Sequence, residues 1–457
     1  MVRLDAKVLM VGMMLGLSCS SNTPELVLNT NQIPVKHWDR VIGGSAADSP
    51  MGLVATSDGG TLVVGYSSSM LSGDKSESSR GGIDYWVVKV NAEGQKIWDK
   101  TLGGSGDDYP TQAVALADGG FVIVGYSNSG ISGDKTETSK GGADYWVVKI
   151  NSEGQKLWDK TYGGALVDEA AAIAVTTDGG FLLGGSSTSG SGGDKTGPNY
   201  GERDYWLIRL NSSGQKLWDK TIGGRANDHL TSLAVVDTDG SFMVVGHSNS
   251  DISYDKTERN NGDKPGTPDF WVVKISGDGQ KIWDKTLGGN LSDMPSAMVS
   301  DLKGGFVIVG SSNSGISSDK TEATDKLDND FWLVSINSKG QKQWDKTLGG
   351  DQWDVAYALL RPTDGGYLVA GTSLSGVGRD KSVASTNADF WIIKLNETGQ
   401  KVWDKTILGN QTETLTRLLL TSNTLLVAGA SQSGLYGDKT EANKGDFDYW
   451  LLDLVFE

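Results

Sequence analysis

The feature that most constrains this chain is a segment of about 60 residues that occurs seven times. Every copy contains an Asp followed by an aromatic residue and a Trp, and the first six copies continue to a second Trp that precedes another Asp. A repeat of this length predicts one repeat array rather than separate domains. The first Asp of each copy is Asp84, Asp144, Asp204, Asp269, Asp330, Asp389 or Asp448. The second Trp is Trp98, Trp158, Trp218, Trp283, Trp344 or Trp403.

The two ends of the chain complement each other. The seventh copy ends before it reaches its second Trp, whereas Trp38 stands near the other end without a first Trp before it. The missing part of the last repeat is therefore present at the start of the chain.

Each repeat reads as four short strands, and none of them shows a sustained helical period. The second strand is continuously apolar, which is typical of a strand buried on both faces. Asn and Gly between the third and fourth strands favour a tight turn. In the second copy the expected strands are 111–117, 121–125, 144–150 and 155–161, with a turn at Asp118-Gly119-Gly120.

Four antiparallel strands repeated seven times predict a β-propeller. The chain begins on a fourth strand, residues 35–42, and ends on a third strand, residues 449–456. Pairing of these two strands would complete the last blade and remove the open edges of a linear array. We therefore predict an all-β, seven-bladed propeller over residues 35–457, closed by strand 35–42 against strand 449–456.

The N-terminal residues have the pattern of an export signal. Arg3 and Lys7 precede the apolar run Val8–Leu17, which is too short to span a bilayer. Cys19, the one cysteine of the chain, follows a small residue, and this arrangement resembles a bacterial lipoprotein signal. The resemblance implies a signal peptide at 1–18, acylation of Cys19 and a polar tether at 19–34. The alternative is a plain secretion signal in which Cys19 has no role.

Composition narrows the range of partners. The net charge is −16, and no cluster of Lys or Arg is present, so we expect no nucleic-acid binding. The only expected contact with a membrane is the lipid anchor. The expected location is the cell envelope, as an outer-membrane lipoprotein on the periplasmic or the exposed side, with secretion as the alternative.

Residues that recur in every copy are interpreted as parts of the scaffold. The two Trp sets are expected to pack between blades. The Asp before each aromatic pair and an Asp-Lys pair in the long loop are expected to form turns or caps. One further repeat position holds an Asp in six copies, with Thr414 expected at the seventh, and we prefer a scaffold role for it over a hydrolytic pair at Asp107 and Asp108. The six are Asp48, Asp108, Asp168, Asp228, Asp293 and Asp354.

The turn between the third and fourth strands resembles the repeat of quinoprotein-like (PQQ-type) propellers. Gly154 and Trp158 match the Gly and Trp of that repeat, whereas Ile150 and Glu153 replace its Asp and Thr. Seven blades and a single cysteine also differ from the quinone enzymes, so we expect no cofactor. The whole repeat over residues 35–457 is similar to that of secreted and lipid-anchored surface proteins of Gram-negative bacteria, some of which are labelled endoglucanases.

In a repeat protein, function is expected where one copy differs from the others. Trp353 is the one Trp of the fifteen outside the two repeated sets. It lies on a loop beside Asp351, Gln352 and Asp354, so it can serve as a stacking platform for a sugar ring. The alternative is that it fills a gap between loops.

The fourth copy is the other outlier. It has the longest loop, 249–268, which carries Tyr254, and it has His229 and His247 where other copies have Tyr109 and Tyr126. Together with Asp228 these residues can line one pocket. Loop histidines are more often structural than ligands, and we expect neither a metal site nor a catalytic site here.

Three functions stay open. We favour a non-enzymatic scaffold that binds an unknown protein, because no catalytic motif is assembled. The second is binding of a polysaccharide, and the third is hydrolysis of a glycan by two loop carboxylates. The candidate ligand face consists of Trp353, His229, His247, Asp228 and Tyr254.

Overall fold

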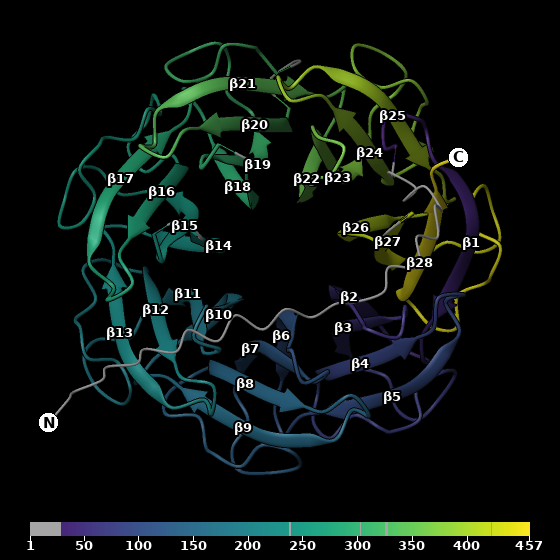
Figure 1. Ribbon diagram of the computed structural model, residues 1–457, viewed down its shortest axis with the longest axis horizontal. Helices are drawn as coiled ribbons and strands as arrows, with labels where there is room; N and C mark the ends of the chain where they lie inside the picture. The colour runs from purple at the N-terminus through teal and green to yellow at the C-terminus, as the bar shows by residue number, and fades with distance from the viewer. Residues whose placement is uncertain (1–28, 237–238, 302, 325–327, 422) are drawn as a thin grey trace, which may run out of the picture.

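The computed structural model describes residues 29–457 apart from 237–238, 302, 325–327 and 422. The predicted signal peptide and Cys19 lie outside the described residues. The described residues form a ring of seven four-stranded antiparallel sheets, as predicted (Figure 1). They include no helix of the length and apolarity that a membrane span requires.

The strands of the seven blades run in chain order from the centre of the ring to its rim, except in the last blade. Blade one contains β2 (Asp48–Ala55), β3 (Thr61–Ser67), β4 (Asp84–Val90) and β5 (Lys96–Leu102). Blade two contains β6 (Asp108–Ala115), β7 (Phe121–Ser127), β8 (Asp144–Ile150) and β9 (Lys156–Tyr162). Blade three contains β10 (Asp168–Val175), β11 (Phe181–Ser187), β12 (Asp204–Leu210) and β13 (Lys216–Ile222). Blade four contains β14 (Asp228–Val236), β15 (Ser241–Ser248), β16 (Asp269–Ile275) and β17 (Lys281–Leu287).

The remaining blades complete the ring. Blade five contains β18 (Asp293–Ser300), β19 (Phe306–Ser312), β20 (Asp330–Ile336) and β21 (Lys342–Leu348). Blade six contains β22 (Asp354–Leu360), β23 (Tyr367–Ser373), β24 (Asp389–Leu395) and β25 (Lys401–Ile407). Blade seven contains β26 (Glu413–Leu420), β27 (Thr424–Ser431), β28 (Asp448–Val455) and, as its outer strand, β1 (Val35–Ile42).

The inner strands begin earlier than the sequence pattern indicated. β6 begins at Asp108 rather than at residue 111, because Asp108 pairs with Ser127 and extends the ladder. A bulge between Pro110 and Gln112 breaks the alternation of side chains on which the sequence boundary rested. The apolar second and third strands have both faces covered by neighbouring blades, which explains their continuous apolar sequence.

The predicted closure of the ring is confirmed. β1 pairs antiparallel with β28, from Val35 opposite Val455 to Ile42 opposite Tyr449. The side-chain contacts of the other blades also recur across the chain ends, since Trp450 Nε1 donates to Asp39 at 3.2 Å, as Trp86 does to Asp99 at 3.0 Å. The two ends of the chain thus form one blade with the same contacts as the others.

Residues just before β1 close a gap that the joined blade would otherwise leave. In the other blades the second Trp of one blade lies against the turn glycine of the next, as Trp98 does against Gly154. Blade seven has no such turn, because its outer strand β1 does not follow β28 in the chain. Thr30, which is fully buried, takes that place: its carbonyl accepts a hydrogen bond from Trp403 Nε1 at 2.9 Å, and its Oγ1 donates to Asp364 at 2.7 Å.

The first Trp of each blade packs between blades, as predicted. Tyr85 of blade one packs against Trp146 of blade two with ring centroids 4.7 Å apart and an interplanar angle of 51°, and its hydroxyl donates to the Trp146 carbonyl at 3.2 Å. The same tilted aromatic pair occurs at all seven junctions. A fully buried Trp contributes about 4–6 kcal/mol through the ~150–250 Å² of surface that it removes from water.

We predict that Trp146→Ala lowers the free energy of unfolding by about 3–5 kcal/mol, because it leaves a cavity between two blades. The midpoint of guanidinium unfolding, followed by tryptophan fluorescence and circular dichroism, measures this change. The control is Trp353→Ala, which removes a half-exposed Trp and is expected to change stability by less than about 0.5 kcal/mol. Equal losses in the two variants would contradict the assignment of the ring's stability to the junctions.

Candidate functional sites on the loop face

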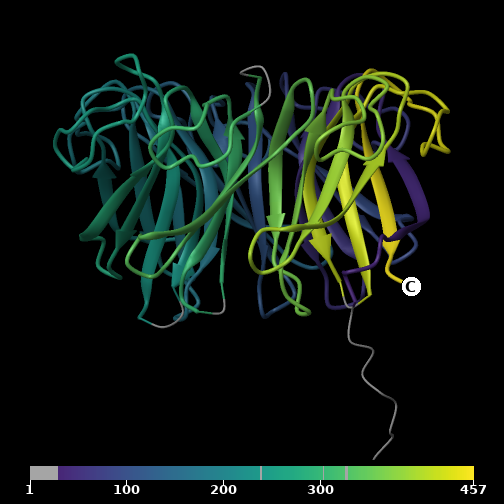
Figure 2. The same ribbon diagram turned by 90° about the horizontal axis from the view of Figure 1, so that it is seen from above.

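One face of the ring carries all the long connections. The loops after strand two and after strand four of each blade lie on it, and we call it the loop face (Figure 2). The opposite face carries short turns, such as 56–60 and 91–95, and we call it the turn face. The predicted candidate residues all belong to the loop face or to strand ends next to it.

Every junction between blades holds two buried acids next to the loop face. One is the Asp at the start of strand three, and the other is the acid at the start of strand one of the next blade. We call each couple an acidic junction pair, and all fourteen side chains are inaccessible to solvent. The pairs are Asp84 with Asp108, Asp144 with Asp168, Asp204 with Asp228, Asp269 with Asp293, Asp330 with Asp354, Asp389 with Glu413, and Asp448 with Asp48.

The buried acids explain why a pair of glycines recurs after the fourth strand. A Cβ added to Gly103 would lie 1.9 Å from Asp84 Oδ1 and 2.9 Å from Asp108 Oδ2, so only glycine fits between the two carboxyls. Asp108 accepts hydrogen bonds from Gly104 N at 2.7 Å and Ser129 Oγ at 3.0 Å. The backbone of the loop is thereby folded around the pair.

The repeated lysine of the long loop supplies the opposite charge. Lys75 is buried, donates to Thr101 Oγ1 at 2.6 Å and lies 5.4 Å from the centre of the Trp86 ring. Its ammonium interacts favourably with Asp48 and Asp84. Seven such lysines face fourteen acids. These two sets of side chains balance each other in charge only when each acidic junction pair keeps one proton.

The pKa values agree with this account. Burial raises the pKa of Asp84 to about 6, of Asp204 to about 7 and of Asp269 to about 8, and the facing acid of the next blade contributes to each rise. Burial also lowers the pKa of Lys75 to about 8. The acids are held by the scaffold, as expected for residues that recur in every blade.

The seventh member of the strand-one position is Glu413, not the predicted Thr414. Glu413 N donates to the Ala388 carbonyl at 2.8 Å, as Asp354 N does to the Asn329 carbonyl in blade six. Its longer side chain reaches Ser431 and Ser433, and burial raises its pKa to about 7. Asp107 and Asp108 do not form a hydrolytic pair, because Asp108 is buried in the junction while Asp107 accepts from Ile83 N at 3.0 Å.

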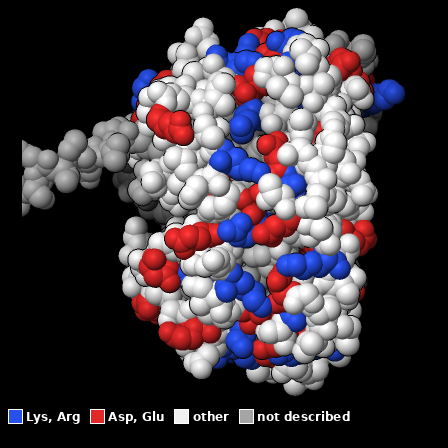
Figure 3. Space-filling model, turned by 90° about the vertical axis from the view of Figure 1, so that its right-hand side faces the viewer, with Lys and Arg blue, Asp and Glu red and all other residues white. Residues whose placement is uncertain are grey.

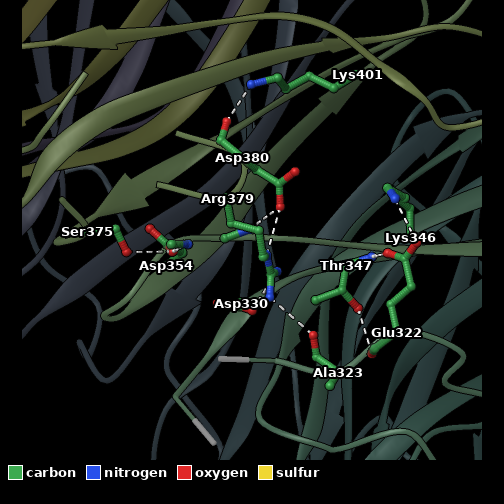
Figure 4. Close-up of polar contacts among 12 residues, drawn as sticks. Glu322, Ala323, Asp330, Lys346, Thr347, Asp354, Ser375, Arg379, Asp380 and Lys401 are labelled. Carbon is green, nitrogen blue, oxygen red and sulfur yellow. Dashed lines mark hydrogen bonds and ion pairs between the residues drawn. The ribbon is translucent and has the colours of Figure 1, made fainter. Parts of the chain in front are cut away.

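The junction between blades five and six contains an arginine that the sequence pattern did not single out (Figure 4). Arg379 donates to Asp330 at 2.9 Å and to Asp380 at 3.0 Å. Burial would lower the pKa of the Arg379 guanidinium, but the two carboxylates raise it. The φ of Arg379 is 23°, in the left-handed region that favours glycine, and four other blades have glycine at this position. An arginine directly before the Asp-Lys pair was therefore the feature of the sequence that could have identified this residue.

The two histidines of blade four lie together, as predicted, but Asp228 does not join them. His229 and His247 face each other across β14 and β15 with ring centroids 5.3 Å apart. Burial lowers the pKa of His247 to about 4 and lowers that of His229 as well, so both rings are neutral at pH 7. Asp228 precedes His229 in the strand and points to the opposite side, into its acidic junction pair.

Tyr254 and Trp353 are both exposed on the loop face. Tyr254 is 62% exposed and stacks on Tyr200 of blade three with ring centroids 4.8 Å apart. Trp353 is 52% exposed and borders a cavity of about 430 Å³ between blades five and six. Apolar side chains of Met294 and Tyr357 and polar groups of Asn313 also line this cavity. The five predicted residues thus lie at four separate places rather than in one pocket: the histidine pair, the junction of Asp228, Tyr254 and Trp353.

Comparison with known proteins identifies relatives at low identity. No protein-family model matches the chain. The chain is similar to Regulatory protein FlaEY of Caulobacter vibrioides, with 24% identity over 388 residues that cover 78% of this chain and 40% of FlaEY. The chain therefore matches well under half the length of that relative.

Comparison with solved structures also finds matches at low identity. A protein of unknown function from Dyadobacter fermentans is 12% identical, and the match covers 93% of this chain and 99% of that one with a TM-score of 0.47. Sqt1 from Chaetomium thermophilum is 10% identical, with coverage of 92% and 100% and a TM-score of 0.45.

We predict that the propeller loses stability as the pH rises from about 4 to 8. The buried acids with raised pKa values keep protons in the folded chain that the unfolded chain has released, so unfolding releases protons and a higher pH favours it. A carboxyl whose pKa is one unit higher in the folded chain contributes about 1.4 kcal/mol to this loss, and we expect the Tm to fall by more than about 5 °C. Differential scanning calorimetry at constant ionic strength measures this fall.

The matched variant is Asp269→Asn, which keeps the size of the side chain but cannot ionise. Its loss of Tm between pH 5 and pH 8 is expected to be smaller than that of the unaltered chain. The control is Glu93→Gln on an exposed turn, which should follow the unaltered chain. A Tm that is flat or rising over this range would refute the protonated junction pairs.

Proposed function

We propose that this protein is a non-enzymatic propeller of the bacterial cell envelope, anchored through an acylated Cys19, that binds a protein partner on its loop face. The observation that carries the proposal is a ring of exposed aliphatic side chains on that face. They occupy one position of the long loop, three residues before the Asp of the Asp-Lys pair, and are 56–71% exposed. We call them the aliphatic ring: Leu71, Ile131, Ile252, Ile316, Val377 and Leu435.

Single exposed aliphatic residues are common, but here one position places an exposed aliphatic side chain on the loop face in six of the seven blades. The outer wall also has exposed aliphatic side chains at one repeat position, such as Ile97 and Leu157, but a belt of Lys and Arg bordered by Asp and Glu crosses the side seen in Figure 3. Ion pairs recur at one repeat position of the outer strands, such as Lys100 with Glu77 at 3.0 Å and Lys160 with Glu137 at 2.8 Å. A partner with an apolar surface is thus expected on the loop face rather than on the rim.

The attachment of the N-terminal residues supports the same orientation. Thr30 is bound to Asp364, which lies in the turn between β22 and β23 on the turn face. The chain therefore joins the propeller on the side opposite the aliphatic ring. An anchor placed before this point would leave the loop face pointing away from the membrane and free to bind.

An enzymatic function has less support. The repeated acids on the loop face are buried in junctions, where glycine, serine and lysine groups hold them. The name of FlaEY, a regulatory protein, fits a binding role better than a catalytic one. A binding module is the function that these observations favour.

Site-specific photo-crosslinking in intact cells of the native host tests the proposal. A photoreactive residue at Ile316 in the full chain is expected to give a discrete protein adduct, and the same residue at Ile97 on the outer strand is not. Both are exposed isoleucines, 69% for Ile316 on the loop face and 56% for Ile97 on the rim, so the pair differs mainly in location. Absence of any adduct at Ile316 would refute a protein partner.

The variant for this experiment follows from the chain itself. Blade three has Ser191 at the aliphatic-ring position, so serine is compatible with the fold of the loop. We predict that Ile131→Ser combined with Val377→Ser lowers the yield of the Ile316 adduct by at least tenfold with an unchanged Tm. The control is Leu157→Ser combined with Leu217→Ser on the outer strands, which should retain the adduct.

Carbohydrate binding is a second candidate, favoured by Trp353 and its cavity. An exposed indole beside a cavity with the amide of Asn313 suits a sugar ring, which offers an apolar face and hydroxyl edges. In retention assays on a panel of insoluble polysaccharides, Trp353→Ala should then lose at least tenfold in retention. Tyr254→Ala, at an exposed aromatic residue of the same face, should not. If the unaltered chain is not retained on any polysaccharide, this candidate is rejected.

A further inference from the structure

The wall of the central channel has one charged side chain at a position where the other blades have small or neutral ones. This position is the fifth residue of the innermost strand in each blade. The residues are Gly52, Gln112, Ala172, Ser232, Ala297, Ala358 and, in blade seven, Arg417. Arg417 is therefore a local departure from the repeat at the centre of the ring, and the scaffold does not require it in six of seven blades.

The guanidinium of Arg417 reaches across part of the channel. Nη1 donates to the Thr416 carbonyl at 2.8 Å, and Nη2 donates to the Thr111 carbonyl of blade two at 3.3 Å. Blade one lies between blades seven and two, and its Gly52 adds no side chain at this level. The two bonds hold the guanidinium plane inside the channel and use two of its five N–H groups.

The charge of Arg417 has no ion-pair partner in the part of the chain that the structure describes. By contrast, Arg379, Arg203 and Arg209 each pair with an acid. Burial lowers the pKa of Arg417, and no neighbouring charge raises it. Arg417 is partly buried in the channel wall. A partly desolvated guanidinium without a counter-charge is costly, and an anion from solution would lower that cost.

A cavity of suitable size adjoins the guanidinium. It has a volume of about 180 Å³ and is lined by the innermost strands of blades two to seven. Its wall combines Arg417 with hydroxyl and amide groups and with small apolar residues. The polar members besides Arg417 are Gln112, Thr231, Ser232, Ser296 and Tyr357. At about 30 Å³ per water molecule, the cavity holds the equivalent of about six waters.

We propose that the central channel binds a small oxyanion, a carboxylate or a phosphate group on a solute of about six non-hydrogen atoms, through Arg417. The planar guanidinium offers paired N–H donors that match the two oxygens of such a group. The hydroxyls of Ser232 and Tyr357 belong to the wall formed by blades four and six and suit the remaining oxygens of the solute. This site is separate from the aliphatic ring and does not depend on a protein partner.

Titration calorimetry and thermal shift of the full chain test the proposal. The probes are inorganic phosphate, lactate and succinate, each compared with chloride at equal ionic strength. At least one probe is expected to bind saturably with one site per chain and to raise the Tm, and comparison of the three distinguishes phosphate from carboxylate as the preferred group. If none binds saturably, the proposal is overturned.

Variants then locate the site. Arg417→Gln is expected to weaken binding at least tenfold, whereas Arg259→Gln, at an exposed arginine of the loop face, should leave it unchanged. Ala297→Leu fills the channel and leaves the guanidinium in place, so it should also abolish binding and serves if Arg417→Gln does not fold. Retention of full affinity in folded Arg417→Gln, or in Ala297→Leu, would refute a site in the channel.

Discussion

The packing of a Tyr or Phe of one blade against the Trp indole of the next is the contact on which the propeller depends. Each blade is a four-stranded sheet with two apolar faces, so no blade is stable alone, and each face is covered only by a neighbour. The aromatic pair places the largest side chains where adjacent sheets diverge toward the rim. The acids, lysines and glycines near the loop face are then ordered around this contact, since Lys75 lies on Trp86 and Asp99 accepts from its indole nitrogen.

The fold could be predicted from the sequence because the same strand pattern, turn residues and Trp positions recur in the seven repeats. The place of closure followed from one unmatched Trp at each end, and β1 has the predicted bounds. Strand starts were less accurate, because a bulge after Pro110 changes the alternation that marks an edge. The sequence could not show which acids form the acidic junction pairs. Each pair joins residues of two different blades, so their contact depends on how the blades pack.

The candidate sites could also be predicted only in part from the sequence. Aromatic residues outside the repeat, such as Trp353 and Tyr254, could be recognised by their absence from the other copies, and both are exposed on the loop face. Arg379 and Arg417 differ from the other copies just as clearly, but their neighbours are ordinary residues. Only the folded ring shows that one neutralises a buried acid and that the other lies in the channel without a counter-charge. The residues that differ from the repeat are thus the ones that give single blades chemical properties of their own.

The joined blade also sets the order of events during biosynthesis. β1 is the first strand of the ring to leave the ribosome, yet its partner β28 is the last strand of the ring to be made. Until then β1 has no edge to pair with, and the contact of Thr30 with Trp403 of blade six has no closed ring to support it. Closing a loop of this length is slow compared with pairing inside a blade, so the final step of folding must follow synthesis of β28. A shorter nascent chain remains an open arc with exposed sheet edges, which proteases and chaperones can distinguish from the finished ring.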